Sequence, residues 1–177
     1  AFAQQARGKF SEAITDYTKT LEIVPECAEA YANRAYVLAL HHDIEKALDD
    51  WSAVLVINPR LKTVFYNRGN LRLSQGDLEG AFVDFDQAVA SEPKYVVASN
   101  NRAIVRAGPG DMDGAIAAFT RATKLNSHFA QAYANRGLVQ LQQGNKREAD
   151  RDFARSLELD PSLKLIIEQR VNQISQK

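Results

Sequence analysis

The chain has 177 residues, of which 45% are hydrophobic and 25% charged, and its 22 Lys and Arg residues balance 22 Asp and Glu residues. This composition excludes a disordered chain, which combines low hydrophobicity with a high net charge. A net charge of zero also leaves no overall basic field to attract nucleic acid or an anionic membrane surface, so we expect neither as a partner.

No stretch approaches the roughly 20 apolar residues that a membrane-spanning helix needs, and residues 1–7 lack the features of a signal peptide. The single Cys27 excludes an internal disulfide framework. The sequence therefore favours a soluble protein, and slightly favours the cytoplasm without identifying the compartment.

The chain repeats itself every 34 residues. One register holds Pro25, Pro59, Pro93 and Pro161, with Ser127 in the remaining slot, and a second holds the Asn-Arg dipeptides at 33–34, 67–68, 101–102 and 135–136. A period of this length is typical of helical arrays, whose stacked hairpins form an extended concave surface.

Residues 1–27 supply the last 27 positions of one repeat, so residues 1–7 resemble the tail of a first helix already in progress. Without a Met or a helix cap, this end would leave an apolar face uncovered. We expect further repeats or another domain before it. Alternatively, the uncovered face could dock on a second copy of the chain.

Four whole repeats follow, at residues 28–61, 62–95, 96–129 and 130–163. In each, apolar residues recur at spacings of three and four, stop at a polar or Gly-containing turn and then recur, which predicts two antiparallel helices. The second helix ends before the proline position. It is expected to begin at an N-cap with a side-chain oxygen, namely Asp43, Asp77, Asp111 or Asn145.

Residue size predicts the packing of these helices. Small residues mark the close approaches, at Ala35, Gly69, Ala103 and Gly137 in the first helices and at Ala13, Ala47, Ala81, Ala115 and Ala149 in the second. One helical turn after each second-helix alanine stands an aromatic residue: Tyr17, Trp51, Phe85, Phe119 and Phe153. We interpret this row as core and not as a cofactor site.

Residues 164–177 are expected to form a capping helix. Leu163, Ile167, Val171 and Ile174 make its apolar stripe, while Glu168, Gln169, Arg170, Asn172 and Gln173 face elsewhere.

Because the small, aromatic and proline positions coincide over several repeats, residues 1–163 resemble the tetratricopeptide repeat (TPR) family. The resemblance implies an all-α fold: a right-handed superhelix, or α-solenoid, of antiparallel helix pairs. It also implies that the first helices line a concave groove that binds a peptide or a protein partner.

Two departures from the family pattern stand out. The large apolar residue expected late in the first helix is Leu38 in one repeat but Arg72, Arg106 and Gln140 in the others, so this layer must carry charge. In the third whole repeat, Gly108-Pro109-Gly110 predicts a shortened first helix. The alternative is a notch beside Ala107 that a partner side chain could enter.

The resemblance places the sixth repeat position in the groove, where this chain carries Asn33, Asn67, Asn101 and Asn135. An amide offers a donor and an acceptor to a peptide backbone, although these side chains could instead tie neighbouring helices together or be solvated. The other groove residues expected are Tyr36, Tyr66, Asn70, Leu73, Asn100, Ile104, Gln131, Leu138 and Gln142.

This neutral groove lacks the clamp with which TPR domains hold the acidic carboxyl ends of the chaperones Hsp70 and Hsp90. That clamp uses basic residues at the second and sixth repeat positions, whereas the second positions here are Glu29, Thr63, Val97 and Gln131. An acidic carboxyl terminus would find no charged partner in this groove.

A row of arginines stands where the family usually carries leucine: Arg34, Arg68, Arg102 and Arg136. The second helices carry Asp16, Asp50, Asp84 and Asp152 at one repeated position, which Ala118 interrupts. Because an unpaired buried guanidinium costs several kcal/mol, we expect partly buried ion pairs within a repeat or between neighbours.

Chemistry-bearing motifs are lacking. Adjacent residues on a helix point about 100° apart, so His41-His42 is expected to be a solvated pair and not a metal site. We find no phosphate-binding Gly loop, zinc spacing or activated nucleophile, and expect no cofactor or enzymatic activity. The sequence predicts a peptide- or protein-binding module, with a regulatory or localising segment of a larger enzyme and a self-assembly module as alternatives.

Overall fold

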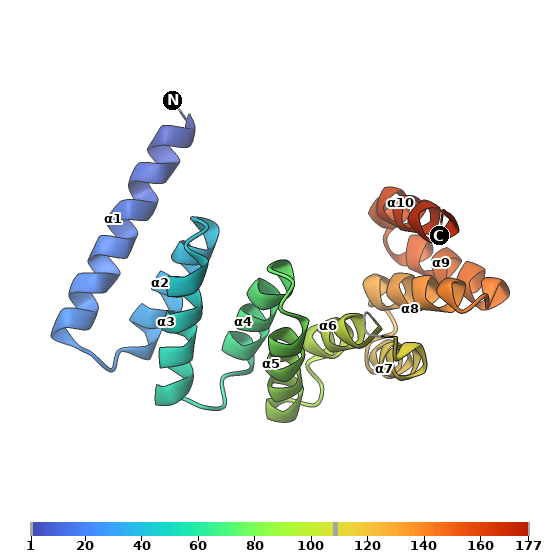
Figure 1. Ribbon diagram of the computed structural model, residues 1–177, viewed down its shortest axis with the longest axis horizontal. Helices are drawn as coiled ribbons and strands as arrows, with labels where there is room; N and C mark the ends of the chain where they lie inside the picture. Colours follow the sequence, from blue (N-terminus) through green and yellow to red (C-terminus); the bar gives the residue numbers. More distant parts are fainter. Residues whose placement is uncertain (1, 108–109, 177) are drawn as a thin grey trace. The chain divides into compact units, whose positions relative to one another are not determined.

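The computed structural model describes residues 2–107 and 110–176, which contain ten α-helices, one short 3-10 helix and no strand (Figure 1). The expected all-α fold of paired helices is therefore confirmed for this part of the chain. The chain divides into two compact units, Ala1–Ser91 (unit 1) and Glu92–Lys177 (unit 2).

Unit 1 contains one long helix followed by two helix pairs. Its elements are α1 (Phe2–Ile23), α2 (Ala28–Leu40), α3 (Ile44–Ile57), α4 (Lys62–Ser74) and α5 (Leu78–Ser91). The pairs are α2 with α3 and α4 with α5, while α1 packs against α2 and α3 packs against α4. Each helix thus buries its apolar face against a neighbour in the sequence.

Helix α1 differs from the expectation for residues 1–27. In the later repeats the turn between the paired helices holds one residue with positive φ, at His42, Gly76, Gly110 or Gly144. The equivalent Gly8 instead lies inside a continuous helix. The expected separate helix tail at residues 1–7 is therefore wrong. Lys9 stands where the later repeats have Asp or Asn, and it offers no side-chain oxygen to cap a new helix.

Unit 2 contains two helix pairs and a terminal helix. Its elements are α6 (Val96–Ala107), α7 (Met112–Leu125), α8 (Ala130–Gln142), α9 (Lys146–Leu159), the 3-10 helix η1 (Pro161–Leu163) and α10 (Lys164–Ser175). The pairs are α6 with α7 and α8 with α9, and α7 packs against α8. Helix α10 also packs on α8 and buries Ile167, which is 6% exposed.

The small and aromatic residues pack largely as expected. Trp51, Phe85 and Phe119 are buried, as are the alanines one turn before them, and each such ring contributes about 1.5–3 kcal/mol through burial. Tyr17 and Phe153 are only half-buried. At Gly69, a Cβ atom would lie 2.8 Å from Phe85 Cε1, which explains why this close approach uses glycine.

The expected N-caps are confirmed at only two of four helices. Asp77 Oδ1 accepts a hydrogen bond from the Gly80 backbone N–H at 2.9 Å, and Asp111 Oδ1 accepts one from Gly114 at 2.9 Å. The expectation is wrong for Asp43 and Asn145, neither of which makes a side-chain cap.

The four side chains at these positions have different partners. Glycine at 80 and 114 leaves room for the aspartate, because a Cβ atom at either position would collide with the carboxylate. Asp43 is followed by Lys46, whose Nζ binds the Asp43 carboxylate at 2.7 Å. Asn145 instead donates from Nδ2 to Gln143 Oε1 at 3.1 Å.

Candidate functional site

The arginine row forms ion pairs within its own repeats. Arg34 donates from Nε to Asp50 Oδ2 and from Nη2 to Asp50 Oδ1, each at 2.8 Å. The equivalent pairs Arg68–Asp84 and Arg136–Asp152 reach 2.6 Å. The expectation of partly buried ion pairs is confirmed for these three arginines. In the third whole repeat, Ala118 offers Arg102 no such carboxylate.

Each of these guanidinium groups also reaches the preceding repeat, which the sequence interpretation missed. Arg34 Nη1 donates to Thr18 Oγ1 at 3.0 Å, Arg68 Nη1 to Ser52 Oγ at 2.9 Å, and Arg136 Nη1 to Thr120 Oγ1 at 3.0 Å. The hydroxyl lies sixteen residues before the arginine and the aspartate sixteen after it. One side chain therefore joins the second helices of two consecutive repeats.

Hydrogen bonding to aspartate holds the pKa of Arg34 and Arg136 above the ordinary arginine value, against the opposing effect of burial. The guanidinium carbons also lie over aromatic rings three residues earlier, at 5.6 Å for Tyr31 and 5.5 Å for Tyr133. These arginines are fully engaged within the fold, so we assign them a structural role.

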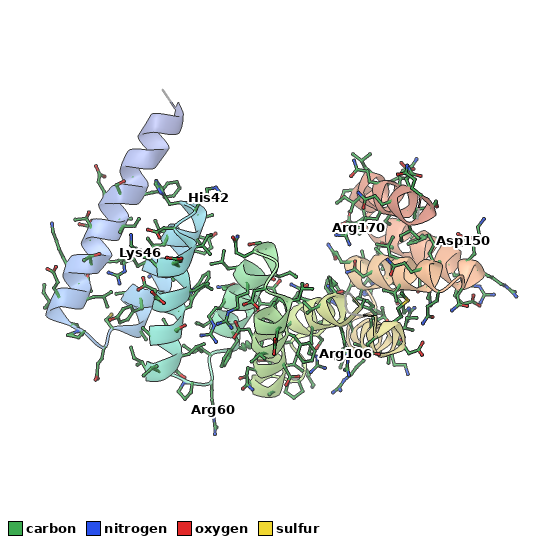
Figure 2. The ribbon with its side chains drawn as sticks, viewed as in Figure 1. His42, Lys46, Arg60, Arg106, Asp150 and Arg170 are labelled. Atoms are coloured by element: carbon green, nitrogen blue, oxygen red, sulfur yellow. The ribbon has the colours of Figure 1, made fainter. Side chains whose placement is uncertain are left out.

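The layer that departs from the family's apolar pattern is charged, as expected. Arg72 Nη1 donates to Asp84 Oδ2 at 2.9 Å. Asp84 therefore pairs with both Arg68 and Arg72. Arg106 pairs with Asp111 at the turn between α6 and α7 (Figure 2). Gln140 has a buried Oε1 that accepts no hydrogen bond among the described residues.

Six of the expected groove residues lie in unit 1, on α2 and α4. Asn33 and Tyr36 are exposed on α2, Tyr36 to 58%, whereas Asn67, Tyr66, Asn70 and Leu73 are half-buried on α4. The Tyr66 ring lies 6.0 Å from the Phe85 ring, so Tyr66 contributes to packing as well as to the surface. None of the six lines the pocket described next.

Unit 2 contains a pocket of about 1180 Å³ lined by residues of α6, α7, α8 and α10. Its described lining residues are Ile104, Ala107, Gly110, Met112, Phe119, Asn135, Leu138, Val139, Gln142, Arg170, Gln173, Ile174 and Gln176. Four expected groove residues are therefore brought together, namely Ile104, Asn135, Leu138 and Gln142. Gln131 is exposed at the start of α8 and does not line it.

The pocket lies beside the position predicted for a notch. Helix α6 ends at Ala107, and both Ala107 and Gly110 line the pocket. The Gly108-Pro109 part of that prediction lies outside the described residues.

Amide groups connect the pocket wall to the interior. Asn135 Nδ2 on α8 donates to Asn100 Oδ1 on α6 at 3.1 Å, and Asn100 Nδ2 donates to Asn101 Oδ1 at 3.1 Å. Asn100 is 4% exposed, so its expected place on the groove surface is wrong. Asn101 does not line the pocket. Asn135 thus ties two first helices together while also lining the pocket.

The sequence interpretation of the last helix also needs correction. Arg170 and Gln173 were expected to face away from the apolar stripe, yet both line the pocket together with Ile174. Figure 2 labels Arg170 on α10. Positions 170, 173 and 174 are three and four residues apart and so share one helix face. This spacing was the available signal.

Other classes of site find little support within residues 2–107 and 110–176. His41 and His42 are exposed, as expected for a solvated pair. No three His, Cys, Asp or Glu side chains in this part of the chain gather closely enough to hold a metal ion. None of the described helices is both long and apolar enough to cross a membrane.

Comparison with known proteins identifies the repeats. The chain matches a family model described as TPR repeat over residues 109–144. Models described as tetratricopeptide repeat match residues 130–163, and residues 3–60 together with 66–119. No curated protein matches the sequence.

Solved structures are similar in fold. A crystal structure of MamA has a TM-score of 0.81 and 22% identity, with 90% of this chain and 94% of that chain covered. YrrB, described as a TPR protein with an unusual peptide-binding site, has a TM-score of 0.77 and 18% identity, covering 98% and 87%. TTC0263 of Thermus thermophilus, a thermophilic TPR protein, has a TM-score of 0.69 and 21% identity, covering 99% and 95%.

Proposed function

Because the chain belongs to the tetratricopeptide repeat family, we propose that this protein–protein interaction module holds a peptide segment of its partner in the pocket of unit 2. The observation that carries the proposal is the pocket itself. Its volume of about 1180 Å³ exceeds the usual range of roughly 300–1,000 Å³ for ligand pockets, so it has room for a bulky side chain and adjoining backbone.

The lining has the composition of a binding site. Ile104, Leu138 and Ile174 offer apolar surface from three different helices, and Asn135 and Gln142 offer amide groups. A pocket that combines apolar and polar surface in similar shares suits a ligand that is held by burial and oriented by hydrogen bonds.

The free energy of binding is expected to come mainly from burial of the apolar surface. Each neutral hydrogen bond contributes about 0.5–1.5 kcal/mol net, whereas association costs on the order of 4–15 kcal/mol. The amides therefore set the direction and register of the peptide. Asn135 uses one amide donor within the fold, so its carbonyl oxygen remains to accept an N–H from the ligand backbone.

We propose nine peptide-binding residues. Three of them, Ile104, Asn135 and Leu138, line the pocket, and the other six lie outside it. Asn33, Tyr36, Tyr66, Asn67 and Asn70 in unit 1, and Asn101 in unit 2, are proposed as further peptide contacts, each within its own unit. YrrB, a TPR protein with an unusual peptide-binding site, supports peptide binding as a use of this fold.

The proposal is tested with a substitution whose larger side chain should fill the pocket. Ala107 lines it at the end of α6, and Ala107→Phe should abolish binding of peptides selected on the wild-type chain from a library of random linear peptides. Leu141→Phe is the matched control, because position 141 is the same repeat position on α8 but does not line the pocket.

Affinity is measured by fluorescence anisotropy, with circular dichroism to verify the fold of both variants. Unchanged peptide affinity in a folded Ala107→Phe chain would place binding elsewhere. A library that enriches nothing on the wild type would contradict binding of linear peptides by this chain.

A further inference from the structure

Arg170 occupies the same repeat position as the structural arginines, since it stands 34 residues after Arg136. The environment differs, however. Each structural arginine donates to a hydroxyl sixteen residues earlier, whereas position 154, sixteen residues before Arg170, is alanine. Among the described residues, Arg170 forms no ion pair or hydrogen bond. Arg170 lines the pocket instead.

The pocket is neutral apart from this side chain. Arg170 is the one charged residue among its described lining residues. Neighbouring charges compensate one another, because Lys164 pairs with Glu168 at 4.0 Å on the same helix and Arg106 pairs with Asp111. A ligand in the pocket therefore meets a single uncompensated positive charge beside apolar and amide surface.

We propose that the pocket selects a peptide in which a bulky apolar residue is flanked by an internal Asp or Glu, and that Arg170 binds the carboxylate. This inference rests on the function proposed above and specifies its ligand. The apolar side chain enters between α6, α8 and α10, while the carboxylate lies at the α10 wall. Helix α10 thus contributes to ligand selection as well as covering α8.

Charge and geometry favour a carboxylate. A guanidinium can bind a carboxylate through two parallel N–H···O hydrogen bonds, and Gln173, one turn away on the same wall, can donate a further N–H to the same group. A side-chain carboxylate fits better than a chain terminus. The clamp with which this family holds a carboxyl terminus uses several basic side chains, whereas Arg170 is the one charged residue among the described lining residues.

The test uses the full chain and a display library of random linear peptides whose two ends are both joined to the carrier protein, so that no free carboxyl terminus is present. Peptides enriched on the wild type should carry Asp or Glu beside an apolar residue. On Arg170→Gln the acidic preference should disappear, and on Arg170→Glu it should change to Lys or Arg. Lys164→Gln, which removes one positive charge from the same helix outside the pocket, should keep the wild-type preference.

A double-mutant cycle then measures the pair directly. For a selected peptide, Asp→Asn should weaken binding to the wild type about threefold, in line with an exposed ion pair, and leave binding to Arg170→Gln unchanged. The difference should shrink in high salt.

The outcomes separate this inference from the proposed function. Peptides with an apolar residue but no acidic preference, bound equally by wild type and Arg170→Gln, would overturn the role of Arg170 and leave the pocket as the peptide site. An acidic preference that persists in Arg170→Gln but is lost in Lys164→Gln would also overturn it. Binding that Ala107→Phe does not affect would instead overturn the proposed function.

Discussion

At the scale of single residues, Asp84 has the most demanding environment in unit 1. It is 0% exposed and accepts hydrogen bonds from both Arg68 and Arg72. Asp50, at the same position one repeat earlier, pairs with Arg34, and the residue equivalent to Arg72 is Leu38. The same aspartate position thus compensates two positive charges in one repeat and one in its neighbour.

This difference predicts unequal effects of the same substitution. Asp84→Asn removes the charge but keeps the side-chain size, so it leaves the Arg68 guanidinium uncompensated and leaves Arg72 with Asp77 alone, at 3.7 Å. We expect the free energy of unfolding to fall by about 3 kcal/mol, the lower end of the range for breaking a buried ion pair, because both arginines retain some access to water. Asp50→Asn should cost about half as much. Urea unfolding followed by circular dichroism measures both, and equal losses would mean that Arg72 contributes nothing to this cluster.

At the scale of helices, the caps show what a sequence pattern can and cannot predict. The position of Asp43, Asp77, Asp111 and Asn145 correctly marks where the second helices begin. Asp77 and Asp111 bond the first turn. Asp43 instead binds Lys46, and Asn145 binds Gln143. The start of a helix follows from local sequence, whereas its cap depends on a further side chain.

The caps yield a prediction for unit 2. Asp111→Ala should lower the free energy of unfolding by about 1 kcal/mol, because it removes a hydrogen-bonded N-cap from α7. Asn145→Ala should cost only a few tenths, because Asn145 makes no cap bond. Asp111→Asn separates the cap from the ion pair to Arg106, since asparagine can cap but carries no charge. If Asp111→Asn is as unstable as Asp111→Ala in urea unfolding, the ion pair and not the cap stabilises this turn.

The repeat register predicted most of the fold because equivalent positions have similar neighbours in most of the whole repeats. It predicted the small and aromatic core and the Arg–Asp pairs, whose side chains lie sixteen residues apart. It was wrong for α1, where Lys9 replaces the capping residue and the chain continues as a single helix. A register shared by several repeats cannot predict how one atypical repeat behaves.

The candidate site was predicted less completely. Ile104, Asn135 and Leu138 follow from their positions on first helices, and all three line the pocket. Arg170 was missed because the amphipathic pattern of α10 was interpreted as one buried face and one solvated face. A residue at the boundary between the two faces can still line a pocket. Arg170 shares its repeat position with Arg136. This shared position was a usable signal that Arg170 could have a specific role, but the amphipathic pattern was considered alone.

At the scale of the whole molecule, each compact unit contains its own buried cluster. In unit 1, Ala35, Trp51, Val54 and Val64 pack together, and in unit 2, Ala103, Ala115, Phe119 and Val139 do so. In a repeat array, stability is approximately a sum of repeat stabilities and nearest-neighbour terms, so local damage need not spread through the chain. A destabilising substitution in one unit should therefore lower the stability of that unit more than the stability of the other.

Hydrogen exchange measured by mass spectrometry tests this expectation. In Asp84→Asn, amides of α4 and α5 that exchange through opening of unit 1 should exchange about a hundredfold faster, because each 1.4 kcal/mol corresponds to about a factor of ten. Amides of α8 and α9 should change far less. Asp152→Asn is the mirror control, since it removes the carboxylate that pairs with Arg136 in unit 2 and should reverse the pattern. A similar increase across residues 2–107 and 110–176 in both variants would mean that the chain opens as one cooperative unit, and would contradict independent local stability.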